Sequence, residues 1–140
     1  MAEVAPVLLS AVICERVIFD KITGMPSLIN ILQNINSPQY PARHWLNYFC
    51  ELTDGHGDTA TKIRIVEAGG EDKIIFEQTG VVQFTDVKQI VTLAVSMQGI
   101  VFPKPGEYRF QIFANNTLLG ERKVMLWKME PKQQGENNNR

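Results

Sequence analysis

Hydrophobic and polar residues alternate along most of this chain in short runs, and turn residues separate one run from the next. Alternation with a period of two places successive side chains on opposite faces of a β-strand. Few positions follow the spacing of an amphipathic helix. In the clearest run, residues 90–97, the apolar side chains fall at every second position: Val91, Leu93, Val95 and Met97. The pattern therefore predicts an all-β protein.

About eight strands are predicted, with turn residues at the connections between them. The first two are expected to form a hairpin around Gly24. In the last hairpin, Asn115 and Asn116 tolerate the left-handed conformation of a tight turn. Short strands at this spacing are typical of a single antiparallel β-sandwich. The set comprises residues 7–19, 27–35, 44–52, 61–66, 73–78, 90–97, 107–114 and 118–126, with 81–84 a further short strand or a bulged continuation.

The segment at residues 37–41 contains two prolines, Pro38 and Pro41. Proline donates no backbone hydrogen bond, so it is disfavoured inside a sheet. We expect this segment to carry the chain from one sheet of the sandwich to the other.

Length and composition limit the organisation of the chain. With 140 residues, of which 44% are hydrophobic, it can bury one core without metal or disulfide support. We expect one domain at residues 1–130 and a disordered tail at 131–140, where Gln, Asn and charged residues dominate. The formal net charge of −1 gives no basic field for nucleic acid. No apolar stretch reaches the roughly 18 residues of a membrane span.

The apolar run at residues 4–14 is either an export signal or a buried first strand. Export signals begin with basic residues, whereas Glu3 precedes this run, so we expect a strand and a cytoplasmic protein. Cys14 and Cys50 lie in apolar strand contexts and are expected to be buried free thiols. The alternative is an exported sandwich with a disulfide between these two cysteines.

One tyrosine lies in a recognisable structural context. The segment Pro105-Gly-Glu-Tyr108 resembles the corner of a β-sandwich in which a tyrosine hydroxyl bonds to loop backbone. Glu107 and Arg109 point to the opposite face of the strand, so the local sequence supplies no base for the hydroxyl. Tyr108 is therefore predicted to be a structural anchor.

A turn at residues 54–58 places Asp54, His56 and Asp58 close together. Calcium loops need more oxygen ligands, and zinc sites need three or four nitrogen or sulfur ligands. We therefore expect an ordinary turn and assign no metal or cofactor ligand. The alternative is a metal-dependent binder or hydrolase that uses this turn.

Large side chains on the face opposite the expected core indicate a candidate interface. Outward apolar surface, or an unpaired strand edge, usually marks a site of association. The alternative is that a terminal segment or the crossing loop covers some of these rings. The candidate interface residues are Trp45, Phe49, Phe113, Met125 and Trp127.

Two segments resemble a bacterial family of small proteins of unknown function. Residues 17–32 contain a strand that ends in Asp, a Thr-Gly turn and a Ser-Leu-Ile strand. Residues 99–110 contain Phe-Pro-Lys-Pro-Gly-Glu-Tyr-Arg-Phe, and Leu-Gly-Glu-Arg follows at 119–122. The resemblance spans residues 7–126 and implies an immunoglobulin-like β-sandwich without assigned catalytic residues. Where the family's pattern has Gly after Ser-Leu-Ile, this chain has Asn30.

The functional expectation is a non-enzymatic binding or assembly module of the bacterial cytoplasm. No phosphate-binding glycine loop or nucleophile elbow is found in the sequence, which favours a role without catalysis. The protein would act through loops or an exposed strand edge. The expected partner is another protein or a second copy, and neither nucleic acid nor membrane.

Overall fold

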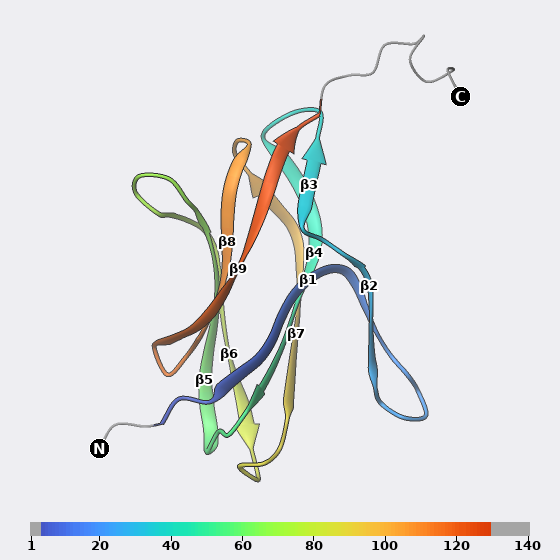
Figure 1. Ribbon diagram of the computed structural model, residues 1–140, viewed down its shortest axis with the longest axis vertical. Helices are drawn as coiled ribbons and strands as arrows, with labels where there is room; N and C mark the ends of the chain where they lie inside the picture. Colours follow the sequence, from blue (N-terminus) through green and yellow to red (C-terminus); the bar gives the residue numbers. More distant parts are fainter. Residues whose placement is uncertain (1–3, 130–140) are drawn as a thin grey trace.

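The computed structural model describes residues 4–129, which contain nine β-strands and no helix (Figure 1). Two sheets pack face to face, so the predicted all-β fold is confirmed. The part of the chain that is described has no helix with the length and hydrophobicity needed to cross a membrane. The predicted tail at 131–140 lies outside the described residues. The strands are β1 (Val7–Phe19), β2 (Pro26–Ile31), β3 (Asn34–Ser37), β4 (Ala42–Thr53), β5 (Gly57–Glu67), β6 (Lys73–Phe84), β7 (Val91–Phe102), β8 (Gly106–Ala114) and β9 (Thr117–Lys128).

One sheet has four strands in the order β2-β1-β4-β7, and the other has five in the order β3-β9-β8-β5-β6. All pairs are antiparallel except β3 with β9, which run parallel. The prediction of about eight strands in a purely antiparallel sandwich was therefore wrong in both respects. The single strand expected at residues 27–35 is split into β2 and β3, while 73–78 and 81–84 join into β6.

The split between β2 and β3 occurs because the chain changes sheet there. Asn30 has a positive φ of 57°, a conformation that interrupts a regular strand. Leu32 donates a last backbone hydrogen bond to Ile13 of the four-stranded sheet. Ile35 then enters the core beside β9, whereas Ile31 stays about half exposed. Residues 38–41 carry the chain back to β4, in agreement with the predicted crossing.

Aromatic rings from both sheets fill the centre of the core. Phe102 and Tyr108 meet edge to face, with ring centroids 5.0 Å apart. Tyr48 is fully buried and donates a hydrogen bond of 2.9 Å from its hydroxyl to the carbonyl of Phe110. The bond satisfies the one polar atom that this ring carries into the core. Burial on this scale is the main source of stability for such a domain.

Tyr108 joins the loop before β8 to the core. Its hydroxyl donates to the carbonyl of Lys104 over 2.5 Å and accepts from the Lys104 amide over 3.3 Å. These are the loop-backbone contacts that the sequence led us to expect of a corner tyrosine. Burial raises the pKa of Tyr108, so the hydroxyl keeps its proton.

Both cysteines are free and buried. Cys50 belongs to the core and lies opposite Ala11, whereas Cys14 lies opposite Asn47, three residues before Cys50 on β4. Burial raises the pKa of the Cys50 thiol to about 12, and burial also raises the pKa of Cys14. Both thiols are therefore protonated at neutral pH.

Candidate functional site

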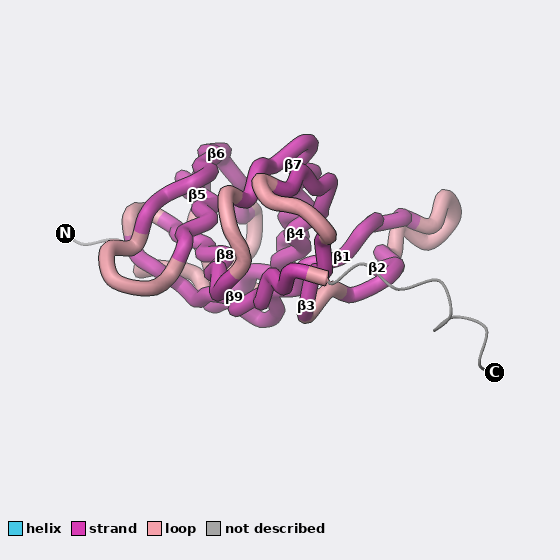
Figure 2. Tube along the Cα trace, turned by 90° about the horizontal axis from the view of Figure 1, so that it is seen from above, coloured by secondary structure: helices cyan, strands magenta, loops and turns pink. Residues whose placement is uncertain are grey.

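The first hairpin projects from the sandwich. β1 pairs with β4 only as far as Cys14, and beyond that residue it pairs with β2 alone. Asn47 of β4 marks the departure, because its side-chain amide donates to the carbonyl of Glu15 in place of a further backbone pair. Figures 1 and 2 show the hairpin extending away from the two packed sheets. We call residues 15–31 the β1–β2 arm.

The tip of the arm, residues 20–25, is a closely bonded turn. The Asp20 carboxylate accepts from the backbone amides of Ile22 and Thr23, each over 2.8 Å. The amides of Thr23 and Ile22 lower the pKa of Asp20, because they bond to its charged form. Gly24 takes a φ of 75° and donates to the Asp20 carbonyl, which closes the turn. The tip is therefore held in one shape by its own sequence.

Apolar side chains cover the arm although little of it is buried. Five of the seventeen large hydrophobic residues that are exposed between residues 4 and 129 lie in this short segment. At the tip, Ile22 is 94% exposed and Met25 is 67% exposed. A concentration of apolar surface on a projecting hairpin differs from the scattered exposed residues of an ordinary surface. The five residues are Ile18, Phe19, Ile22, Met25 and Ile31.

The outer edge of β2 is open to a further strand. β2 ends the four-stranded sheet, and no described strand pairs with its outer side. Proteins usually protect such edges with charged residues, yet β2 contains none. The edge of β6 carries Lys73 and Glu77. β7 is also uncharged, but it contacts β6 on that side of the sandwich.

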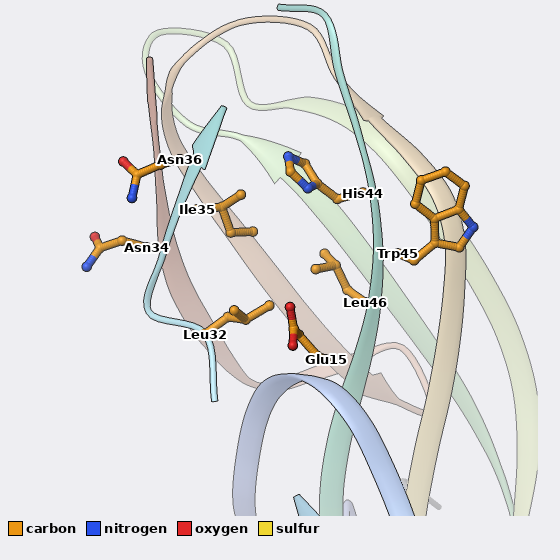
Figure 3. A pocket seen from close by; sticks show the side chains of 8 residues that line it. All are labelled: Glu15, Leu32, Asn34, Ile35, Asn36, His44, Trp45 and Leu46. Atoms are coloured by element: carbon orange, nitrogen blue, oxygen red, sulfur yellow. The ribbon is translucent and has the colours of Figure 1, made fainter. Parts of the chain in front are cut away.

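A cavity of about 240 Å³ lies where the arm joins the sandwich. Figure 3 shows Leu32, Ile35, His44 and Leu46 directed towards it, with the Glu15 carboxylate at the side of the arm. The ring of Trp45 points away from it, to the other side of β4. The lining therefore mixes aliphatic side chains with the polar residues Glu15, Asn34, Asn36 and His44.

Two polar side chains of the cavity are fixed by hydrogen bonds. His44 lies 2.7 Å from the hydroxyl of Ser37, measured from Nε2 to Oγ. Burial lowers the pKa of His44, so the ring is neutral at pH 7. Glu15 accepts a hydrogen bond from the side-chain amide of Asn30 across the arm. The carboxylate of Glu15 is thus the only charged group among the residues that line this cavity.

The five candidate interface residues do not form one patch. Phe113 alternates with the buried Ile112 and Ala114, so it lies on the outer face of the five-stranded sheet. Met125 and Trp127 lie on the same outer face, because Val124 and Leu126 face the core. Trp45 belongs to the other sheet and is 61% exposed.

The prediction that Phe49 is exposed was wrong. Only 5% of its surface is accessible. Phe49 lies on β4, an inner strand of its sheet, with Val12 of β1 on one side and Ala94 of β7 on the other. The flanking strands cover the ring although it points away from the core.

Two aromatic residues on the outer face of the five-stranded sheet, the exposed Trp127 and the partly buried Phe113, have local partners. Trp127 donates from its indole to the side-chain oxygen of Asn34 over 3.3 Å. The ring of Phe113 lies 4.9 Å from both the Lys62 amine and the Arg64 guanidinium, as in a cation–π contact. These contacts stabilise the two rings within the monomer, so their exposure alone does not indicate a partner.

Asp54, His56 and Asp58 lie at the connection between β4 and β5. Asp54 has a φ of 60° and donates its backbone amide to the carbonyl of Val87. His56 and Asp58 are exposed. Between residues 4 and 129, no three histidine, cysteine or acidic side chains come close enough to hold a metal ion.

The arm was missed as a site by the sequence analysis. Its strands were identified as a hairpin around Gly24, but the sequence did not place that hairpin outside the sandwich. The available signal was the pair of exposed apolar residues within a polar turn, Ile22 and Met25. The absence of charge from Pro26–Ile31 was a second signal.

Comparison with known proteins yields a family but no activity. The model of DUF6941, described as a family of unknown function, matches residues 9–126. No curated protein matches the chain. Among solved structures, a β-glucosidase from Listeria innocua in complex with isofagomine is similar with a TM-score of 0.43 and 8% identity. The similarity covers 71% of this chain but only 15% of that enzyme's chain, and it bears on neither fold nor activity here.

Proposed function

The chain belongs to DUF6941, a family of unknown function, and from the geometry of the arm we propose that it is a non-enzymatic assembly module. The β1–β2 arm is the element that joins the module to another protein. The nine-stranded sandwich is the rigid base from which the arm projects.

The observation that carries this proposal is the exposure of apolar side chains on a hairpin outside the sandwich. A two-stranded hairpin is only marginally stable in water by itself. Ile18, Phe19 and Ile22 would gain free energy from burial, at about 25 cal/mol for each Å² of apolar surface removed from water. A partner protein supplies that burial. The open edge of β2 supplies backbone groups for strand addition at the same place.

We also propose that the sandwich is immunoglobulin-like. The order β9-β8-β5-β6 corresponds to the G, F, C and C′ strands of a variable-type sheet, and β4 and β7 take the places of B and E. Tyr108 near the start of β8 corresponds to the corner tyrosine of strand F. In this assignment β1 takes the place of strand A beside strand B, and β2 is an addition at its outer side.

A double variant of the arm tests the proposed function. Phe19→Asp with Ile22→Asp places two charges on the apolar surface while leaving the core residues intact. We expect this variant to lose association with itself or with a protein from its host by at least tenfold, because burial of an unpaired charge is costly. Light scattering and quantitative affinity capture measure the two kinds of association.

Val81→Asp is the matched control, because Val81 is 70% exposed on β6, far from the arm along the sheet order. It should bind as the wild type does. Circular dichroism and melting temperature should be unchanged in both proteins. Association that survives in the arm variant and disappears in the control would refute the proposal.

A further inference from the structure

We propose that the cavity at the root of the arm binds an aliphatic ammonium group, such as the side chain of a lysine, through the carboxylate of Glu15. The site is distinct from the apolar tip of the arm and from the open edge of β2. The inference therefore goes beyond the proposed function and does not rest on it.

The cavity lies where β1 leaves its neighbour. β1 pairs with β4 only as far as Cys14 and Asn47, so the residues of β4 before Asn47 have no described strand on that side. β3 ends the five-stranded sheet, and no described strand pairs with its outer side either. Two open strand edges, one from each sheet, therefore border the same cavity of about 240 Å³.

The backbone of these two edges forms part of the cavity wall. Asn34, Ile35 and Asn36 of β3 all line the cavity, but only Ile35 is buried and directed towards β4 (Figure 3). Residues 44–46 of β4 line the other side in the same way, with Trp45 directed outwards. Backbone carbonyls at such edges are free to accept hydrogen bonds. An ammonium group, which offers three donors and no acceptor, suits them.

The carboxylate of Glu15 determines the charge of the ligand. It is the only charged group among the residues that line the cavity, and Figure 3 shows it at the arm side. The side-chain amide of Asn30 donates to it and holds it in place, while its other lone pairs remain for further donors. Arg16 lies on the opposite face of β1, because neighbouring side chains alternate along a strand. A cation is therefore attracted to the cavity, and an anion is repelled.

Aliphatic side chains determine the rest of the ligand. Leu32, Ile35 and Leu46 are directed into the cavity that the carboxylate borders (Figure 3). A lysine side chain combines an apolar stem with a charged end, so its stem can cover these residues while its amine reaches Glu15. A cavity of roughly 150 Å³ holds a benzene molecule, so the space here is sufficient for a chain of four carbons. A wholly apolar ligand would leave the carboxylate and the strand edges unpaired.

A titration of the full chain followed by nuclear magnetic resonance tests the inference. The ammonium probes are n-butylamine and Nα-acetyl-lysine N-methylamide, and n-butanol is the uncharged probe of the same length as the amine. We expect saturable shifts of the methyl signals of Leu32, Ile35 and Leu46, with dissociation constants of the ammonium probes in the millimolar range. Binding of n-butanol should be weaker by about threefold or more, because it forms no ion pair. Tighter binding of the lysine derivative than of n-butylamine would assign the site to a lysine residue, and equal or weaker binding to a free alkylamine.

Glu15→Gln removes the charge and keeps an acceptor for the amide of Asn30. We expect this variant to bind both ammonium probes about threefold or more weakly, and n-butanol as the wild type does. Glu71→Gln is the matched control, because it removes an exposed carboxylate in the connection between β5 and β6, away from the cavity. It should bind all three probes as the wild type does.

Three results would overturn the inference: equal binding of n-butylamine and n-butanol, ammonium binding that is unchanged in Glu15→Gln, or shifts confined to residues outside the cavity. The arm variant, Phe19→Asp with Ile22→Asp, separates this outcome from that of the proposed function. At physiological ionic strength its distant charges are screened, so it should bind the ammonium probes as the wild type does. Loss of association at the tip and loss of the ammonium site are therefore independent results.

Discussion

At the scale of single residues, buried hydroxyls and small turns fix the shape of the molecule. The Tyr48 and Tyr108 hydroxyls both bond to backbone carbonyls, one in the core and one in the loop before β8. Buried polar groups must be paired in this way, since an unpaired one costs about 1–3 kcal/mol. The two bonds tie the aromatic core to backbone of the five-stranded sheet and of the loop before β8.

Tyr108→Phe tests the anchor role of the corner tyrosine. The variant keeps the ring contact with Phe102 and loses the bond to Lys104. We expect it to lower the free energy of unfolding by about 0.5–1.5 kcal/mol, as measured by chemical denaturation. Association through the arm should be unaffected, and a stable variant that no longer associates would show that Tyr108 has a functional role instead.

At the scale of elements, the arm is the part of the fold that depends most on its own sequence. It lacks a third strand, so its order rests on the turn at the tip. The Asp20 carboxylate holds that turn through two backbone amides. A defined tip is needed if the arm is to enter a partner, because ordering a flexible tip on binding would cost conformational entropy.

Asp20→Ala removes the two side-chain bonds of the tip. We expect faster hydrogen exchange at the amides of Ile22 and Thr23, with a melting temperature close to that of the wild type, because the core is untouched. Exchange rates measured by nuclear magnetic resonance give the result. Unchanged rates at these two amides would show that the backbone bonds of the turn suffice.

The same carboxylate gives the tip a pH dependence. The folded pKa of Asp20 is lowered, so the bonds of its charged form contribute above the unfolded pKa and are lost as pH falls through the folded pKa. Acidification should therefore loosen the tip of the wild type. The Asp20→Ala variant should show no such change at these amides.

Sequence alternation predicts which side chains share a face of a strand. It predicts neither how far the neighbouring strands pair with that strand nor whether its outer side chains are buried. Alternation correctly identified β1 and β2 as a hairpin. It could not show that β1 continues beyond Cys14 without pairing to β4, because that depends on where the pairing with β4 ends. It likewise could not show that Phe49 is covered by the strands on either side.

At the scale of the whole molecule, the pairing of strands far apart in the chain was the feature least predictable from the sequence. The turn at Asn115 and Asn116 was predictable, because both residues take positive φ locally. The parallel pairing of β3 with β9 joins segments about ninety residues apart and leaves no periodic signal. The exposure of the arm depends on where β4 stops pairing with β1, which is a property of the assembled sheet.

The role of the β2 edge is tested most directly by hydrogen exchange of the full chain at low and high protein concentration. Strand addition at the arm predicts that amides of Pro26–Ile31, after the proline itself, become more protected as concentration rises. Amides at the edges of β6 and β7 should exchange at the same rate throughout. Protection that appears at β6 or β7 instead, or exchange at β2 that does not depend on concentration, would contradict association of copies of this chain through the arm.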